Sequence, residues 1–315
     1  MIHRIKAFIS RLKRLLFVYD RLDSLSGLLE RLDRRVEFAQ EALGRIESRQ
    51  LQESVSHSLI ENEFRAFSQW GEDGIIQFLL RHIEIERKIF VEFGGDNYNL
   101  EANTRFLLSN NNWSGLIIDS SEDAIRQLQN SPTYMLYDLK AVSAFITRDN
   151  INDFLTENGI AGEIGILSID VDGNDYWIWN AINVINPAIV IVEYNHRFGR
   201  DMAVTIPYEE SFDRAKAHPS RLYFGASLKA LCCLGDKKGY AFIGCNSNGV
   251  NAFFVRKYKK PEFLRALTAE EGYVPGKFGE LIERNGELIK LSPFEEKKLL
   301  LGLGLPLIHI EDSGG

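Results

Sequence analysis

Seven short apolar runs, most of them separated by helix-like segments, occupy the chain between residues 64 and 257. Strands that alternate with helices are typical of a parallel sheet with helices on both faces. Only NSNGVN separates the last two runs, which is short enough for a hairpin, so we expect one antiparallel strand at that edge. We therefore predict an α/β fold with a doubly wound sheet. The expected strands are 89–93, 115–119, 134–138, 164–170, 188–194, 240–245 and 252–256, and the expected helices are 73–83, 103–110, 122–129 and 150–157.

Residues 1–60 carry a different pattern, with no proline and with apolar residues at alternating steps of three and four. That spacing is the heptad seam of a coiled coil. A long helix with one apolar stripe cannot bury the stripe alone, so we predict a helix that forms a homo-oligomer. The alternative is a single amphipathic helix packed on its own domain. The seam consists of Leu15, Val18, Leu22, Leu25, Leu29, Leu32, Val36, Ala39, Leu43 and Ile46.

The first turns of this helix are basic as well as amphipathic, in the sequence MIHRIKAFISRLKRLLF. Such a helix can lie on an anionic membrane surface, so residues 1–16 are either a peripheral membrane contact or the solvated start of the coiled coil. We find neither a signal-peptide pattern nor an apolar run long enough to span a bilayer. The three cysteines fit a reducing cytoplasm, and we expect a cytoplasmic protein, with the inner face of the membrane as an alternative.

The net charge of −7 argues against a general nucleic-acid-binding surface. The last part of the chain is charged and ends in LIHIEDSGG, without a recognisable motif. We therefore divide the chain into an oligomerisation helix (1–60), an α/β domain (61–257) and a C-terminal helical extension (258–315).

Ligands of open parallel sheets bind beyond the carboxyl ends of the strands. The first expected strand ends in VEFGGD, and the Gly94–Gly95 pair permits positive φ and close approach of a ligand to the backbone. The third glycine of a dinucleotide fingerprint is missing, and Asp96 would repel a phosphate. The loop therefore suits a cationic or zwitterionic cofactor. Asp119 ends the second strand, where a carboxylate can accept hydrogen bonds from ribose hydroxyls, although it could also cap the helix that follows.

Acidic residues also gather at the ends of the fourth and fifth expected strands. Asp170 and Asp172 lie in LSIDVDGND, and Glu193 and Asn195 lie in VEYNH. Converging carboxylates repel one another unless a cation lies among them, so we expect a sulfonium or a hard divalent ion there. For Asp175 a helix-capping role is favoured. His196 follows directly, and it is either a general base near neutral pH or a structural residue.

The motifs FSQWGEDGIIQFLL, VEFGGDNYNLEANTRFLL, WSGLIIDSSEDAI, ILSIDVDGNDYWIW, IVEYN and YFGASLKALCCLGDKKGYAFIG stand in this order over residues 67–256. Together they resemble the FkbM-type S-adenosylmethionine (SAM)-dependent methyltransferases. The resemblance implies a seven-stranded Rossmann-like methyltransferase sheet and methyl transfer to oxygen, often on a sugar or natural product. One departure is Asp96–Asn97, where the family usually has Asp-Gly.

The resemblance also implies roles for individual residues. Asp170 would lie close to the sulfonium and take part in catalysis, with His196 as a second catalytic candidate. A separate likeness is to metal-dependent O-methyltransferases, which carry acids and an amide at the ends of strands four and five, as Asp170 or Asp172, Glu193 and Asn195 do here. That likeness implies a divalent ion such as magnesium, and the alternative is a base without a metal. The residues implied around the cofactor are Ser68, Gln69, Glu92, Gly94, Gly95, Thr104, Asp119, Ser120, Lys140, Ala141, Val142 and Asp170.

The leading functional hypothesis is accordingly a SAM-dependent O-methyltransferase that acts on a saccharide, such as a surface polysaccharide or its precursor. A nicotinamide-dependent oxidoreductase would share Asp119 but lacks the third glycine. The non-enzymatic alternative is an inactive methyltransferase-like scaffold, because a fold alone does not fix function.

Overall fold

The computed structural model describes residues 2–51, 56–94, 98, 102–277, 281–284 and 287–311, without the side chains of 2–10, 12, 281–284 and 287–288. Its centre is a seven-stranded sheet with the order β3-β2-β1-β4-β5-β8-β7. Strands β1 to β5 are parallel, and β8 runs antiparallel to both of its neighbours. The predicted doubly wound sheet and its antiparallel strand are confirmed. The strands are β1 (Ile89–Phe93), β2 (Ser114–Asp119), β3 (Leu139–Ser143), β4 (Gly162–Ile169), β5 (Ile185–Glu193), β7 (Tyr240–Cys245) and β8 (Asn251–Arg256).

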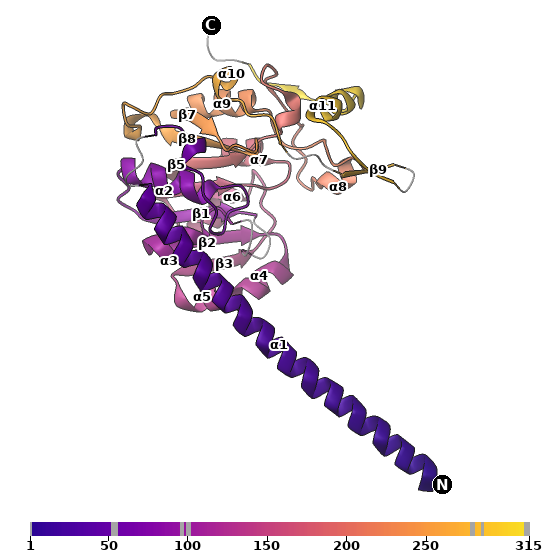
Figure 1. Ribbon diagram of the computed structural model, residues 1–315. Coiled ribbons are helices and arrows are strands. Elements are labelled where there is room, and N and C mark those ends of the chain that lie inside the picture. The colour runs from indigo at the N-terminus through magenta and orange to yellow at the C-terminus, as the bar shows by residue number, and fades with distance from the viewer. Residues whose placement is uncertain are drawn as a thin grey trace.

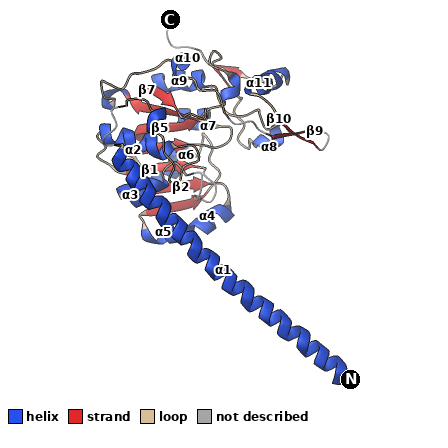
Figure 2. Ribbon diagram, viewed as in Figure 1, coloured by secondary structure: helices blue, strands red, loops and turns tan. Residues whose placement is uncertain are grey.

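Both faces of this sheet are buried, because alternate residues of each central strand enter different apolar clusters. In β1, Val91 and Phe93 join one cluster, whereas Phe90 joins the other. Figure 2 shows the strands stacked through the body with helices on either side. The covering helices are α2 (Glu72–His82), α3 (Arg105–Asn111), α4 (Glu122–Gln129), α6 (Ile151–Glu157), α7 (Asp175–Ala181) and α9 (Leu228–Lys237).

The third strand lies further along the chain than predicted. Residues 134–138 were expected to form it, but Pro132–Leu136 is helix α5, and β3 begins at Leu139. The hydroxyl of Ser131 accepts a hydrogen bond from the backbone N–H of Tyr134, and Pro132 occupies the first helical turn. A Ser-Pro start of this kind favours a helix over a strand. The prediction of a strand rested instead on the apolar residues YML at 134–136.

Helix α1 (Ile2–Gln50) is continuous, and only its C-terminal part contacts the body, beside α2 and α3. The rest projects away from the sheet, and the N-terminus lies at the far end (Figure 1). No helix in the described part of the chain is both long enough and apolar enough to cross a membrane.

Residues 258–311 are helical only in part and fold back over the body. Helix α11 (Pro293–Gly302) packs on the short 3-10 helix His196–Phe198 through a fully buried ion pair, in which Arg197 Nε lies 2.7 Å from Glu296 Oε2. Strand β11 (Ile308–His309) pairs with β6 (Val204–Thr205). The remaining elements are the short helices α8 (Arg214–Ala217) and α10 (Ala269–Gly272), the hairpin β9 (Leu281–Arg284) and β10 (Glu287–Lys290), and the 3-10 turns Ile60–Asn62 and Lys257–Lys259.

Candidate active site

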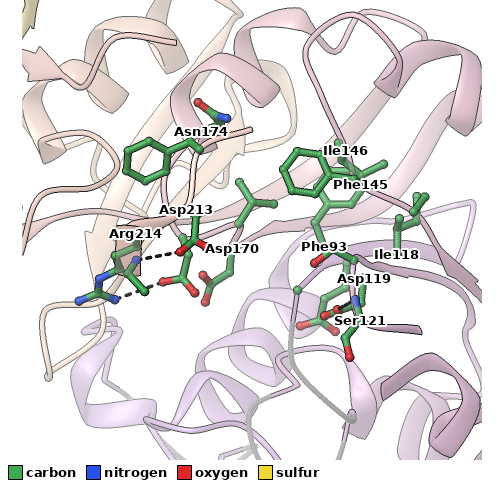
Figure 3. A pocket seen from close by; sticks show the side chains of 18 of the residues that line it. Phe93, Ile118, Asp119, Ser121, Phe145, Ile146, Asp170, Asn174, Asp213 and Arg214 are labelled. Carbon is green, nitrogen blue, oxygen red and sulfur yellow. Dashed lines mark hydrogen bonds and ion pairs between the residues drawn. The ribbon is translucent and has the colours of Figure 1, made fainter. Parts of the chain in front are cut away.

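Two cavities lie side by side at the carboxyl ends of the parallel strands. The larger has a volume of about 960 Å³ and is lined by the ends of β1, β2 and β4. The smaller, of about 330 Å³, lies at the end of β5. Gln69, Asp170, Asp172 and Arg214 line both, so the cavities meet at these residues. In the larger cavity Asp119 and Ser121 lie at one end and Arg214 at the other, with Asp170 between them (Figure 3).

Gly94 follows β1 directly and has φ +79°, as the sequence led us to expect for a turn at this point. A Cβ at this position would overlap the backbone carbonyl oxygen of Asp170. The glycine is therefore required by the close approach of the ends of β1 and β4, and it also lines the larger cavity. Gly95, predicted to share its role, lies outside the described residues.

The end of β2 forms one wall of the larger cavity. Asp119 is half-buried, and its Oδ1 accepts a hydrogen bond from the backbone N–H of Ser121 at 2.7 Å. Ser121 in turn caps α4, because its hydroxyl accepts from the N–H of Ala124. Asp119 thus supports the helix start and also lines the cavity, together with Ser120. The two interpretations of Asp119, as a cap and as a ligand for a ribose, are compatible in this geometry.

The residues predicted beside an adenine are displaced by the shift of the third strand. Ala141 and Val142 lie within β3, paired with Ile117 and Ile118 of β2, and neither lines the larger cavity. Lys140 lies in the same strand and is exposed. The cavity wall is instead formed by the residues that follow the strand, Ala144, Phe145 and Ile146. The prediction for Ala141 and Val142 assumed that the strand ended at residue 138, which the structure contradicts, and their contact with a cofactor stays a prediction.

A loop before α2 brings Gln69 into both cavities. Asp73 holds this loop, because its Oδ2 accepts hydrogen bonds from the backbone N–H groups of residues 66, 67 and 68 at 2.7–2.8 Å. Ser68 is buried, and its hydroxyl donates a hydrogen bond to the same carboxylate. Glu72 accepts from Trp70 N–H and also from Asn251 Nδ2. The motif SQWGED therefore forms a loop held by internal hydrogen bonds, which places Gln69 and Trp70 at the cavities. Ser68 contributes by stabilising this loop.

Glu92 and Thr104, both predicted near the cofactor, form a second set of buried hydrogen bonds. The Glu92 carboxylate accepts hydrogen bonds from Asn103 N–H at 2.8 Å and from both the hydroxyl and the N–H of Thr104. Burial raises the pKa of Glu92 to about 7. Glu92 and Asn103 line the larger cavity, whereas Thr104 is fully buried behind them. These hydrogen bonds hold the start of α3 against the end of β1.

Three carboxylates converge where the two cavities meet. Asp170, Asp172 and Glu193 each place an oxygen so that these atoms all lie within 4.8 Å of one another. Burial, and then the charges of Asp170 and Asp172, raise the pKa of Glu193 well above its usual value. Glu193 Oε2 is a buried oxygen without a hydrogen-bond partner. Arg214 supplies one nearby positive charge, with Nη1 at 3.2 Å from Asp172 Oδ1.

Asp172 adopts a left-handed backbone conformation, with φ +53°. Asp175 maintains the turn around it, because its two oxygens accept from the N–H groups of Val171 and Gly173 at 2.9 and 3.1 Å. Asp175 therefore supports the turn before α7, whereas the N-cap position of the helix is held by Asn174, so the helix-capping role favoured for Asp175 is not observed. The turn leaves Asp172 projecting at the rim, where its side chain is 68% exposed.

His196 and Asn195 are both buried beside the cluster. His196 lines the smaller cavity, and burial together with the charges of Arg197 and Arg214 lowers its pKa to about 3. It is therefore neutral at physiological pH and a weak base. Asn195 lines neither cavity, since its amide donates to the carbonyls of Leu222 and Phe224 and its oxygen accepts from Arg197 N–H. These bonds make Asn195 a support for the turn after β5, and no contact here joins it to the carboxylates.

Sequence reasoning missed Arg214 and the aromatic lining. Arg214 lies in α8, stacks on the Phe224 ring at 3.8 Å and lines both cavities. No residue pattern distinguishes Arg214 from the other cations of its segment. Trp70 and Phe224 line the smaller cavity, and Phe145 lines the larger one. A single aromatic residue in a loop carries no periodic signal.

Comparisons with known proteins give only distant structural matches. No protein-family profile matches this chain, and no curated protein does. A SAM-dependent methyltransferase from Clostridium acetobutylicum aligns over 68% of this chain and 97% of its own, with 10% identity and a TM-score of 0.37. An O-methyltransferase from Bacillus cereus, in complex with S-adenosylhomocysteine (SAH), aligns over 53% and 72%, with 13% identity and a TM-score of 0.33.

The pyocyanin biosynthetic protein PhzM aligns with 13% identity and a TM-score of 0.33. The alignment covers 56% of this chain and 52% of PhzM, so this chain spans about half the length of that protein. At these TM-scores the matches carry no weight for function. The strand order β3-β2-β1-β4-β5-β8-β7, with β8 antiparallel, is itself the arrangement of the Rossmann-like SAM-dependent methyltransferase fold.

Proposed function

We propose that this chain is a SAM-dependent O-methyltransferase that methylates a hydroxyl group of a saccharide. The observation that carries the proposal is the pair of joined cavities, one ending at Asp119 and the other lined by three carboxylates. A cofactor in the larger cavity would expose its reactive end to an acceptor in the smaller one. The order of the FkbM-like motifs supports the same reading, and assignment to that family is part of the proposal.

The larger cavity fits an adenosyl cofactor in its chemistry. Asp119 offers a carboxylate at the end of β2, where ribose hydroxyls can donate to it, and Phe145 and Ile146 offer an apolar wall to a purine. Asp170 lies towards the other end, where a negative charge favours a sulfonium (Figure 3). The cofactor supplies a methyl group on a positively charged sulfur. Gly94 and Gln69 leave space and a polar contact for its amino-acid part.

The smaller cavity fits a polyhydroxylated acceptor. Carboxylate oxygens of Asp170 and Glu193 accept hydrogen bonds from hydroxyl groups, and the Trp70 and Phe224 rings offer flat apolar surfaces to a sugar ring. Glu193, whose pKa is raised, is a better proton acceptor than His196, whose pKa is about 3. These side chains would orient the acceptor hydroxyl towards the methyl group and remove its proton.

A divalent cation is part of this proposal, since the donor set fits one. Asp170, Asp172 and Glu193 provide oxygen ligands, which magnesium and manganese prefer, and Glu193 Oε2 is buried without a hydrogen-bond partner. Such an ion would stabilise the deprotonated form of an acceptor hydroxyl. The predicted fourth ligand, Asn195, is engaged in three other hydrogen bonds. We therefore assign the site to the three carboxylates.

The direct test is calorimetric titration with SAH and, separately, with NAD, each with and without magnesium. We expect SAH to bind and NAD not to bind. Asp119→Ala should weaken SAH binding by roughly 10- to 100-fold, the effect of losing hydrogen bonds to a charged group. Asp123→Ala is the matched control, because Asp123 is exposed on α4, at the same end of the sheet. NAD binding would favour the oxidoreductase, and binding of neither would favour the inactive scaffold.

A further inference from the structure

The C-terminal part of α1 docks on its own body through a face of small and polar residues. A Cβ at Gly44 would come within 2.8 Å of the Phe106 ring, so any larger residue here would force the ring or the helix to shift. Glu37 forms an ion pair with Arg105, which is largely buried. Arg45 Nη2 donates to the Ser109 carbonyl, and Ser48 Oγ donates to Gln77 Oε1, both at 3.4 Å.

A different face of the same helix carries the apolar seam, and the body leaves it uncovered. The nine large seam side chains between residues 15 and 46 are 48–66% exposed. Val36, Leu43 and Ile46 are among them, although they lie in the docked part of the helix. Figure 1 shows most of α1 extending beyond the body. The apolar stripe is therefore not used for intramolecular packing at any point along its length.

The two faces are separated in the way that a coiled coil requires. If Leu15, Leu22, Leu29, Val36 and Leu43 occupy heptad position a, the other seam residues occupy position d. The docking residues Glu37, Gly44, Arg45 and Ser48 then fall at positions b, b, c and f. These positions lie on the outer side of a coiled coil, opposite the seam. A partner helix on the seam would not displace the body.

We propose that the seam binds the α1 helix of a second copy of this chain in a parallel, two-stranded coiled coil. The seam is self-complementary, and the flanking charges favour the parallel orientation. Position g carries Arg14, Arg21 and Arg35, whereas the charged residues at position e are Asp33 and Glu47. In a parallel pair in register, position g of one helix lies beside position e of the partner's next heptad, so Arg14, Arg21 and Arg35 lie beside Tyr19, Ser26 and Gln40 and no like charges meet. An antiparallel pair instead places the basic g row against itself.

The narrow apolar stripe of α1 indicates a coiled coil of two helices and not of three or four. In bundles of three or four helices, positions e and g become buried alongside a and d, so those positions are apolar as well. Here they are mostly charged, polar or small, with Leu28 and Tyr19 as the large exceptions. In the parallel pair both bodies lie at the same end, one on the outer side of each helix. If the proposed function holds, the pair would carry two active sites at one end of the coiled coil.

The experiment uses the full chain and measures its mass by light scattering after gel filtration. We expect twice the chain mass of 35.9 kDa. Leu25→Glu with Leu29→Glu should give monomers, because both residues lie in the seam. The matched control is Ser24→Glu with Arg31→Glu, at two exposed positions on the outer side of the helix, which should stay dimeric. A wild-type monomer, a wild-type mass of three or more chains, or a dimeric seam variant would overturn the proposal.

Orientation is tested separately by cysteine cross-linking, which does not depend on catalysis or on cofactor binding. Val18→Cys places a thiol at a d position far from the middle of the helix. A parallel pair in register brings the two thiols together, so oxidation should yield a disulfide-linked dimer. Ser24→Cys on the outer side should not cross-link, and among the native cysteines Cys233 and Cys245 are buried and Cys232 is partly buried. Failure of Val18→Cys to cross-link in a dimeric protein would overturn the parallel orientation.

Discussion

Two groups of acidic residues lie near the same end of the sheet, and they differ in what surrounds their carboxylates. Glu72, Asp73 and Glu92 are fully buried, and each accepts hydrogen bonds from backbone N–H groups of a neighbouring loop. Asp170 and Glu193 belong to the second group and converge on one point with Asp172. The carboxylates of the first group hold loops in place through hydrogen bonds, whereas those of the second group lie close enough to repel one another.

This difference separates structural from functional acids on physical grounds. A carboxylate that accepts several N–H bonds lowers the free energy of the folded state, because the donors would otherwise be buried without partners. A cluster of like charges raises that free energy until a cation or a proton is added. Residues that a fold holds in such an arrangement are candidates for binding and catalysis.

The largest expected effect is the loss of stability when Asp73 is replaced. Asp73→Ala leaves the N–H groups of residues 66, 67 and 68 without their shared acceptor. We expect the free energy of unfolding to fall by about 3–5 kcal/mol, measured by chemical denaturation. Asp123→Ala should change it by less than about 0.5 kcal/mol, because Asp123 is an exposed residue on α4.

The same measurement on Asp170→Asn sharpens the contrast. Removing one charge from the cluster should leave the free energy of unfolding unchanged or raise it slightly, since repulsion is relieved. SAH or cation binding should nevertheless weaken. A loss of stability comparable to that of Asp73→Ala would place Asp170 among the structural acids and remove the distinction.

The second prediction concerns the pH dependence caused by Glu193. Its pKa is raised by burial and by Asp170 and Asp172, so above pH 4.5 the unfolded chain releases the proton that the folded chain retains. Stability therefore falls as pH rises from 4.5 towards the raised pKa. Glu193→Gln should make this slope smaller without abolishing it, because burial also raises the pKa of Glu92 to about 7. A cation must displace the same proton, so magnesium affinity should rise with pH, by up to about tenfold per unit.

Calorimetry with magnesium at pH 6 and pH 8 measures this effect. Glu193→Gln should bind the ion more weakly and with less dependence on pH than the wild type. Glu210→Gln is the matched control, because Glu210 is exposed and lies outside the three-carboxylate cluster. Equal magnesium affinity in the wild type and in Glu193→Gln would show that Glu193 is not a ligand.

Sequence reasoning predicted most of the sheet because periodic burial leaves a strong pattern. The runs at 89–93 and 240–245 match β1 and β7 in full, and 122–129 matches α4. The error at 134–138 arose where a Ser-Pro helix start competed with an apolar run, and it displaced Ala141 and Val142 from the expected position after the strand to a position within it. Local capping chemistry outweighed hydrophobicity there.

The candidate site was predictable where residues follow directly from strand ends. Asp119, Asp170 and Glu193 were found because parallel strands bring their carboxyl ends to one edge. Ser68 and Asn195 lie close to the correct region, but their hydrogen bonds are internal, which spacing cannot reveal. Arg214 comes from a segment with no regular pattern, so only the tertiary structure brings it to Asp172.

The smallest expected effect tests whether Arg214 substitutes for a cation at the cluster. Its guanidinium contacts Asp172 at 3.2 Å and stacks on Phe224. Asp172 is largely exposed, so the pair should contribute less than about 1 kcal/mol to stability. If a divalent ion needs Asp172, then Arg214→Ala removes a competing charge, and magnesium affinity should rise several-fold by calorimetry.

Lys216→Ala is the control on the same helix, because Lys216 pairs with Asp213 outside the cluster. A fall in affinity would instead mean that Arg214 holds the Asp172 side chain in its ligating position.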